Sequence, residues 1–109
     1  MRPAQLRNYL RANRKRLTLS QDDVAFLLGG QSGAKISRYE NFTRVPGLEV
    51  ALALEAIYKR SVGELFGGLY QKVERKVAER AKILVNRKAE GTGSQSVPKR
   101  KVLIELARM

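Results

Sequence analysis

The sequence predicts an all-α protein, a bundle of five short helices followed by a basic helical extension. Two observations favour this fold class. Apolar residues recur three and four positions apart along much of the chain, as they do on the buried face of a helix. Serines at positions 20, 32 and 61 precede such stretches and are suited to cap helix N-termini. With 109 residues and 43% apolar side chains, the chain has enough material for one modest core.

The first two helices are predicted from amphipathic spacing and from terminal signals. Residues 4 to 16 place apolar side chains on one side of a helix, with arginines and a lysine around the rest. Ser20 begins the second helix as its N-cap, and the negative charge of Asp23 in the first turn suits the positive end of the helix dipole. Gly29 and Gly30 end this helix.

The third helix is predicted to run from about Gly33 to Asn41. Ser32 precedes it as a cap, and Ile36 and Tyr39, three positions apart, form its inward face. The helix is short, so it depends on packing against its neighbours.

Two further helices complete the predicted bundle. Residues 48 to 58, LEVALALEAIY, are apolar almost all round, as expected of the central helix of a small bundle. Ser61 and Glu64 form a capping box for a fifth, shorter helix that carries Leu65 and Phe66.

The composition changes after residue 68. Residues 69 to 89 are strongly basic, and the apolar residues from Phe66 onward follow a heptad that is broken where Arg80 stands. Residues 91 to 96, GTGSQS, are typical of a flexible linker, and residues 97 to 109 fit either a strand or a final helical turn. The predicted organisation is therefore a bundle over residues 1–68, a basic helical extension suited to dimerisation over 69–90, and a flexible linker with a C-terminal tail over 91–109.

Composition excludes several kinds of function. The formal net charge of +12 favours nucleic acid or an acidic membrane surface as a partner. Cysteine and histidine are absent, which removes the usual metal ligands and the usual general base. Asp22 and Asp23 are a carboxylate pair, but they stand at a helix start. We expect no metal site, no cofactor and no enzymatic activity. The N-terminus lacks the apolar core of a signal peptide, and no stretch is apolar enough for a membrane span, so we expect a cytoplasmic protein.

The stretch GGQSGAKISRYE, residues 29 to 40, first suggests a nucleotide-binding loop. A Walker-type loop needs consecutive Gly-Lys-Ser/Thr, but Ala34 separates Gly33 from Lys35, and Ile36 follows. A dinucleotide fingerprint needs a preceding strand, and none is predicted. The alternative is a glycine-containing turn between two short helices, which is the layout of a DNA-reading helix-turn-helix.

Three motifs carry a resemblance to a known family. LSQDDVAFLLG, KISRYEN and VPGLEVALALEAIYKRSVGELF resemble, in order and near the right spacing, the helix-turn-helix domain of the phage Cro and C1 repressors and the bacterial XRE-type regulators. The resemblance covers about residues 5 to 66. It implies a lambda-repressor-like five-helix bundle that binds double-stranded DNA, with the helix from Gly33 as its recognition helix.

The resemblance also implies roles for individual residues. It places Gln21 against a phosphate and the base-facing positions at Gly33, Ala34 and Arg38, of which only Arg38 has long-reach donors. Asn41, Thr43 and Arg44 fall where the family contacts the DNA backbone. The full implied DNA-binding set is Gln21, Gln31, Ser32, Gly33, Ala34, Lys35, Ser37, Arg38, Asn41, Thr43 and Arg44. Arg14 and Glu40 are implied to form a structural ion pair that ties the recognition helix to the scaffold.

Three features depart from the family pattern. Gly29 and Ile36 are separated by one residue more than usual, so the register of the turn before Ile36 stays open, and Gln31 becomes a candidate for bonding adenine. Phe42 stands where glycine is common, which predicts a different backbone route because a bulky residue disfavours positive φ. Phe26 and Leu27 are apolar where polar residues are commoner. They either pack under the chain's own C-terminal helix or form a dimer or partner surface.

The sequence therefore predicts a sequence-specific DNA-binding transcriptional regulator, in particular a repressor that binds a partly palindromic operator as a homodimer. Two alternatives stay open. An antitoxin of the same fold would use residues 91–109 to bind a toxin, folding on contact. A non-specific architectural or RNA-binding protein would bind through charge alone.

Overall fold

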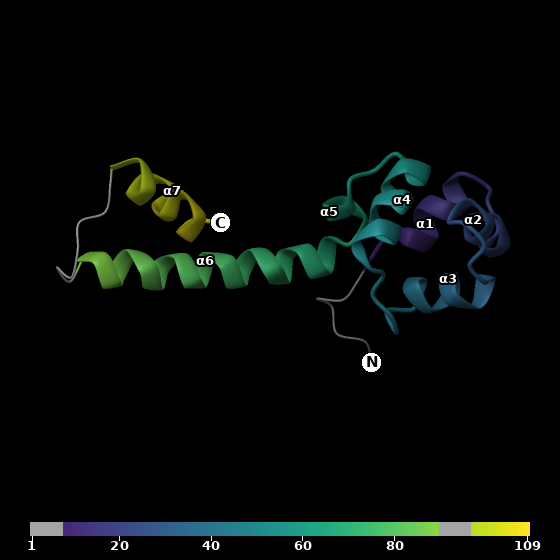
Figure 1. Cartoon of the computed structure of the whole chain (residues 1–109), viewed down its shortest axis with the longest axis horizontal. Coiled ribbons are helices and arrows are strands. Elements are labelled where there is room, and N and C mark those ends of the chain that lie inside the picture. The colour runs from purple at the N-terminus through teal and green to yellow at the C-terminus, as the bar shows by residue number, and fades with distance from the viewer. Residues whose placement is uncertain (1–7, 90–96) are drawn as a thin grey trace. The chain divides into compact units, whose positions relative to one another are not determined.

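The computed structural model describes residues 8–89 and 97–109, and every regular element in these residues is a helix (Figure 1). The helices are α1 (Leu10–Arg16), α2 (Gln21–Leu27), α3 (Gly33–Glu40), α4 (Leu48–Tyr58), α5 (Val62–Leu65), α6 (Gly67–Ala89) and α7 (Val97–Ala107). The chain divides into two compact units, Met1–Tyr70 and Gln71–Met109. The predicted all-α fold class is confirmed. None of the described helices is long and apolar enough to cross a membrane.

Capping boxes set the starts of α2 and α5. The Ser20 Oγ accepts a hydrogen bond from the Asp23 amide at 3.0 Å, and the Asp23 carboxylate accepts one from the Ser20 amide at 2.9 Å. Ser61 and Glu64 repeat this pattern at 3.1 and 3.2 Å. In each box the backbone amide, and then the serine side chain, lowers the pKa of the carboxyl group because it stabilises the charged form. Both predicted helix starts are confirmed.

The first helix is shorter than predicted. It begins at Leu10 because the chain before it is held by other contacts. The Asn8 Oδ1 accepts from the Leu10 amide at 3.1 Å, the Asn8 side-chain amide donates to the Tyr39 carbonyl at 2.9 Å, and the Tyr9 amide donates to the Leu65 carbonyl at 2.8 Å. Residues 8 and 9 therefore join α1 to α3 and α5, while residues 4 to 7 of the predicted helix lie outside the described residues.

The turn between α2 and α3 is built on two glycines. Gly29 and Gly30 have φ values of +95° and +91°, a backbone conformation that residues with a Cβ rarely adopt. The Gly30 amide donates to the Ala25 carbonyl at 3.2 Å and so closes the end of α2. Ser32 then caps α3 through a 3.2 Å hydrogen bond from the Lys35 amide.

Phe42 contradicts the predicted change of backbone route after α3. Its φ is +66°, so a bulky residue takes the left-handed conformation that glycine usually supplies. Such a conformation costs on the order of 1 kcal/mol and is kept only where the surroundings enforce it. The Thr43 amide and hydroxyl both bond the Arg38 carbonyl, each at 3.1 Å, and the Phe42 amide bonds the Tyr39 carbonyl at 3.3 Å. These bonds satisfy the C-terminal carbonyls of α3.

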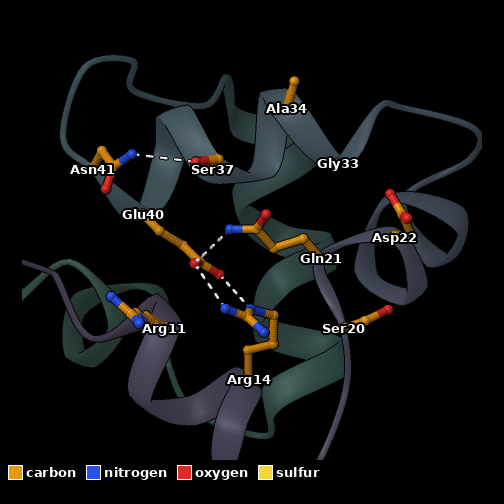
Figure 2. Close-up of a pocket in the computed structure, with 10 residues that line it drawn as sticks. All are labelled: Arg11, Arg14, Ser20, Gln21, Asp22, Gly33, Ala34, Ser37, Glu40 and Asn41. Carbon is orange, nitrogen blue, oxygen red and sulfur yellow. Dashed lines mark hydrogen bonds and ion pairs between the residues drawn. The ribbon is translucent and has the colours of Figure 1, made fainter.

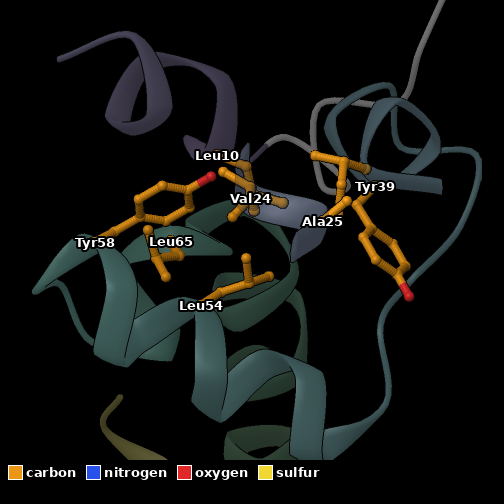
Figure 3. Close-up of a cluster of buried hydrophobic side chains, with 8 residues drawn as sticks. Leu10, Val24, Ala25, Tyr39, Leu54, Tyr58 and Leu65 are labelled. Atoms are coloured by element: carbon orange, nitrogen blue, oxygen red, sulfur yellow. The ribbon is translucent and has the colours of Figure 1, made fainter. Parts of the chain in front are cut away.

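One cluster of buried side chains forms the core of the first unit (Figure 3). Its members come from α1 to α5: Leu10, Val24, Ala25, Ile36, Tyr39, Leu54, Tyr58 and Leu65. The predicted central helix, α4, contributes Leu54 and Tyr58 to the cluster, and only one side of this helix faces it. Its outer side is exposed, and Leu48 reaches 76% exposure. Exposed apolar residues also lie on α2, where Phe26 is 79% exposed and Leu27 is exposed as well.

The second unit contains most of α6 and all of α7. Its buried residues are Ala78 and Ala81 on α6 and Leu103 on α7. Phe66, the first residue of the predicted heptad, instead packs against the core of the first unit. The last segment, for which strand and helix were both open, is helical from Val97 to Ala107. The predicted linker at residues 91–96 lies outside the described residues.

Candidate functional site

The helix α3 has a buried side and an exposed side that face opposite ways. Ile36, Tyr39 and Glu40 are buried. Ala34, Arg38 and Asn41 are exposed, and their spacing of four and three positions places them along one line of the helix surface. This exposed line contains one side chain with several long-reach donors, that of Arg38. The helix therefore presents a small, shallow surface with a single guanidinium.

A hollow of about 670 Å³ lies beside α3, where α1, α2 and α3 meet (Figure 2). It is open to solvent and polar. The residues that line it are Arg11, Arg14, Ser20, Gln21, Asp22, Gly33, Ala34, Ser37, Glu40 and Asn41. It brings together five residues of the implied DNA-binding set, Gln21, Gly33, Ala34, Ser37 and Asn41, and both members of the implied ion pair, Arg14 and Glu40. Of the α3 residues that line this hollow, Gly33, Ala34 and Ser37 are small, and Glu40 is the one long side chain.

Arg14 and Glu40 form a bidentate ion pair at the base of the hollow (Figure 2). The Arg14 Nε lies 2.7 Å from Glu40 Oε2, and its Nη2 donates to Oε1 at 3.1 Å. The Arg14 Nη1 donates to the Leu19 carbonyl at 3.0 Å. The side chains are 11% and 3% exposed, and the hydrogen bond that the guanidinium donates to Glu40 raises the pKa of Arg14. Because this geometry is fixed on both sides, the pair sets the position of α3 relative to α1.

Gln21 is engaged with the same carboxylate. Its side-chain amide donates to Glu40 Oε1 at 3.2 Å, and its side chain lies between the ion pair and the hollow. Glu40 thereby receives hydrogen bonds from three nitrogen atoms on two other helices. Gln21, the implied phosphate-contacting residue, thus lines the hollow and is held there by its hydrogen bond to Glu40.

The buried phenol of Tyr58 lies close enough to the Arg14–Glu40 pair to interact with both charges. Tyr58 is fully buried, and its hydroxyl has no hydrogen-bond partner within the described residues. Burial, with a smaller contribution from the Glu40 charge, raises the pKa of Tyr58 to about 12. The group therefore stays neutral and contributes packing, but its polar atom is left unsatisfied.

Several other implied residues already have hydrogen-bond partners inside the protein. The side-chain oxygen Oε1 of Gln31 accepts a hydrogen bond from the Tyr39 hydroxyl at 3.5 Å, and the Thr43 hydroxyl donates one to the backbone carbonyl of Arg38 at 3.1 Å. The Asn41 amide donates to the Ser37 hydroxyl at 3.2 Å. These contacts orient the polar side chains around α3. Six residues of the implied set lie outside the lining of the hollow: Gln31, Ser32, Lys35, Arg38, Thr43 and Arg44.

Gly33 stands where α3 passes closest to α2. A Cβ at this position would collide with the Asp22 carboxylate oxygen, so any larger residue would displace that side chain. The Asp22 carboxylate therefore occupies the space that a side chain at Gly33 would need.

The hollow also includes two charged residues that the sequence reasoning did not assign to the site. Arg11 and Asp22 line it from α1 and α2. For Arg11 a signal exists, since it precedes Arg14 by three positions and shares its helix face. For Asp22 the sequence indicates only a favourable helix start, because its approach to Gly33 depends on the packing of α2 against α3.

Comparison with known proteins gives one match. A family model described as Helix-turn-helix matches residues 10–65, slightly more than half of the chain. No curated protein and no solved structure matches the chain detectably. The matched range begins with α1 and ends with α5, so it covers the five helices that contribute to the core, of which α1 to α3 also line the hollow.

Proposed function

The chain belongs to the Cro/C1-type (XRE) helix-turn-helix family, and from this premise we propose that it is a sequence-specific repressor that binds an operator as a homodimer. Membership of the family makes it a DNA-binding helix-turn-helix regulator. The proposal adds the sequence specificity, the residues that read the operator, the dimer and the sign of regulation. Its working compartment is the cytoplasm, where the DNA it regulates would lie.

One observation carries the readout proposal. Arg38 is exposed in the middle of the outward line of α3, between Ala34 and Asn41. A guanidinium can bond guanine O6 and N7 together in the major groove, and this is the commonest specific contact of its kind. Ala34 offers a methyl group of the size that fits against the thymine methyl.

The remaining polar residues are proposed to hold the DNA backbone. Gln21 lies at the first residue of α2, where backbone amides point out of the helix, and Arg44 lies exposed beyond the end of α3. Gln31, Ser32, Lys35, Ser37, Asn41 and Thr43 are the other candidates. Such contacts fix the orientation of α3 without reading the sequence. Repression would follow from occlusion of the polymerase at the operator.

The basic extension is proposed to add non-specific affinity. Between residues 69 and 109 the chain has eleven basic and four acidic side chains. Each phosphate that they neutralise should add about 0.9 to the slope of log K against log salt.

A gel-shift titration against the DNA upstream of the chain's own gene tests the proposal, with random DNA as competitor. Arg38→Ala should weaken specific binding by about 1–3 kcal/mol, roughly 5- to 150-fold, and should leave binding to random DNA almost unchanged. Arg60→Ala, which removes an exposed arginine in the turn between α4 and α5, is the matched control and should change specific binding little.

Two results would contradict the proposal. If Arg38→Ala binds the operator as tightly as the wild type, Arg38 does not read the bases. If the wild type binds random and upstream DNA equally, an architectural or RNA-binding role becomes the better account. Copurification of a toxin would instead favour the antitoxin alternative.

A further inference from the structure

Four residues of α6 in the second unit form a regular line, which we call the α6 stripe. They are Val73, Val77, Arg80 and Leu84, separated by four, three and four positions. Val73 is 51% exposed, Val77 36% and Leu84 40%, and Arg80 is exposed as well. A spacing that averages 3.5 residues keeps side chains in line along a helix, which is the pattern of a seam between two long helices.

The contact between α6 and α7 uses a different face. Ala78 and Ala81 are the buried residues of α6, and Val85 lines a hollow together with Ile104 and Ala107 of α7. These α6 positions recur at three and four residues and lie beside the stripe, not on it. Small alanine side chains allow another helix to approach closely. The side chains of the α6 stripe therefore keep part of their surface exposed beside the contact between the two helices.

The second unit is too small to bury its own apolar side chains. Two helices form one layer, and a stable domain packs at least two layers around a core. Among the described residues of this unit only Ala78, Ala81 and Leu103 are buried. Its exposed large apolar residues are Val73, Val77, Ile83, Leu84, Val102 and Met109. The unit thus has an exposed apolar surface that packing against a further layer of helices would bury.

We propose that the α6 stripe packs against the same stripe of a second copy of this chain, with the two helices antiparallel. The stripe is complementary to itself when it is turned end for end. Val73 then lies opposite Leu84 of the second copy, and Val77 lies opposite Arg80. In the parallel arrangement Arg80 would face Arg80, which places two like charges together at the seam. The order of the residues therefore favours the antiparallel dimer. This proposal rests on the homodimer of the proposed function and does not depend on its DNA-reading residues.

The charge of the second unit gives the dimer a characteristic salt dependence. Most of the basic side chains of the chain's C-terminal part lie on α6 and α7, so two copies repel each other at low salt. Salt screens this repulsion, because the Debye length falls from about 10 Å at 0.1 M to about 3 Å at 1 M. Self-association should therefore strengthen with salt, whereas binding to DNA weakens.

Disulfide cross-linking tests the seam directly, because the natural chain contains no cysteine. Val73→Cys and Leu84→Cys chains, mixed and oxidised without DNA at high salt, should give a mixed dimer. Neither variant alone should cross-link, since identical positions in the antiparallel pair lie about 11 residues, or ~16 Å, apart along the helix. A disulfide needs Cα atoms within roughly 7 Å. The pair Arg75→Cys and Glu79→Cys, which lies off the stripe, is the control and should not cross-link.

Charge substitutions on the stripe give an independent test, in which analytical ultracentrifugation measures the dissociation constant of the dimer. Val77→Glu places a carboxylate opposite Arg80 of the second copy, so its dimer should be at least as stable as the wild type. Val77→Lys places two cations together and should weaken the dimer at least 10-fold. Both changes are at an exposed position of a helix, and circular dichroism checks that the helix content is unchanged.

The outcomes separate this proposal from the proposed function. Cross-linking of Val73→Cys with itself, or equal weakening by Val77→Glu and Val77→Lys, would overturn the antiparallel seam. A chain that stays monomeric at high salt and high concentration would overturn it entirely, even if operator binding is intact. A chain that forms the predicted cross-link but does not select its operator would leave the seam standing and refute the DNA readout alone.

Discussion

The two units of the chain are both helical, but they are held together by different means. In the first, five short helices share one buried cluster, and a buried ion pair fixes α3 against α1. In the second, a helix of 23 residues and one of 11 residues bury two alanines and one leucine. Short helices with little intrinsic stability are thus well fixed, whereas the longest helix has the least tertiary support. The geometry of α3 is therefore set by contacts within the first unit, whereas the described residues of the second unit bury little apolar surface.

Truncation of one leucine in each unit should give the largest contrast. Leu54 is 1% exposed in the cluster of the first unit, and Leu54→Ala should lower the free energy of unfolding by about 2–5 kcal/mol. Leu103 is 9% exposed in the second unit, and Leu103→Ala should cost less than ~2 kcal/mol because a two-helix contact can close around a smaller side chain. Urea unfolding followed by circular dichroism measures both. Equal losses would mean that the second unit has a core of its own.

Removal of the carboxylate of Glu40 should have the next largest effect. Glu40→Ala leaves the Arg14 guanidinium buried without a counter-ion, which typically costs about 3–5 kcal/mol. Glu40→Gln keeps an acceptor for Arg14 and should cost less. Glu105→Ala, at an exposed position of α7, is the control and should change stability by no more than ~0.5 kcal/mol. If Glu40→Ala were as mild as the control, the ion pair would not hold α3.

Tyr58→Phe should stabilise the first unit. The Tyr58 hydroxyl is buried without a partner, so its removal should raise the free energy of unfolding by about 1 kcal/mol. The pKa of Tyr58 is raised to about 12 in the folded chain. Below pH ~10, the pKa of a free tyrosine, the phenol is neutral in both the folded and the unfolded chain, and the free energy of unfolding does not depend on its titration. As the pH rises from ~10 toward 12, the unfolded chain ionises first, so the free energy of unfolding falls.

Urea midpoints from pH 8 upward test this alkaline loss. The gap between Tyr58→Phe and the wild type should widen above pH ~10. Tyr70→Phe, at an exposed position, serves as the control and should follow the wild type. A constant gap across this range would show that the phenol is solvated in the folded chain.

The smallest effect should come from the capping box of α2. The bonds from Ser20 lower the pKa of Asp23, so the charged carboxylate adds stability above its ordinary pKa, and this stability is lost as the pH falls through the folded value. Asp23→Asn should therefore lie below the wild type at pH 7 and merge with it in acid. Asp22→Asn, outside the box, should keep the wild-type pH dependence. A difference that persists at pH 2 would contradict this account.

The elements that local signals determine were predicted well. The caps at Ser20, Ser32 and Ser61 and the inward face of Ile36 and Tyr39 follow from spacing over a few residues, and the structure contains them. The Arg14–Glu40 pair was implied by the resemblance to the family, since residues 26 positions apart leave no local signal.

The failures arose where distant contacts override local preference. The helix α1 begins late because Asn8 and Tyr9 bond to α3 and to Leu65, and Phe42 keeps a positive φ because the bonds around the end of α3 enforce it. The approach of Asp22 to Gly33 likewise depends on how α2 packs on α3. None of these contacts has a periodic signature. The DNA-contacting roles of the site residues are predictions that the proposed binding experiments address.

The turn formed by Gly29 and Gly30 has a consequence for how operator preference can change. The position of Arg38 is fixed by the buried side of α3, through the packing of Ile36 and Tyr39 and the ion pair of Glu40 with Arg14. It does not depend on the length of the turn that precedes α3. Insertions or deletions in this turn should therefore leave the exposed residues of α3 in the same positions. For protein engineering, residues 29–32 are the position at which the recognition helix of another helix-turn-helix regulator can be joined to this scaffold.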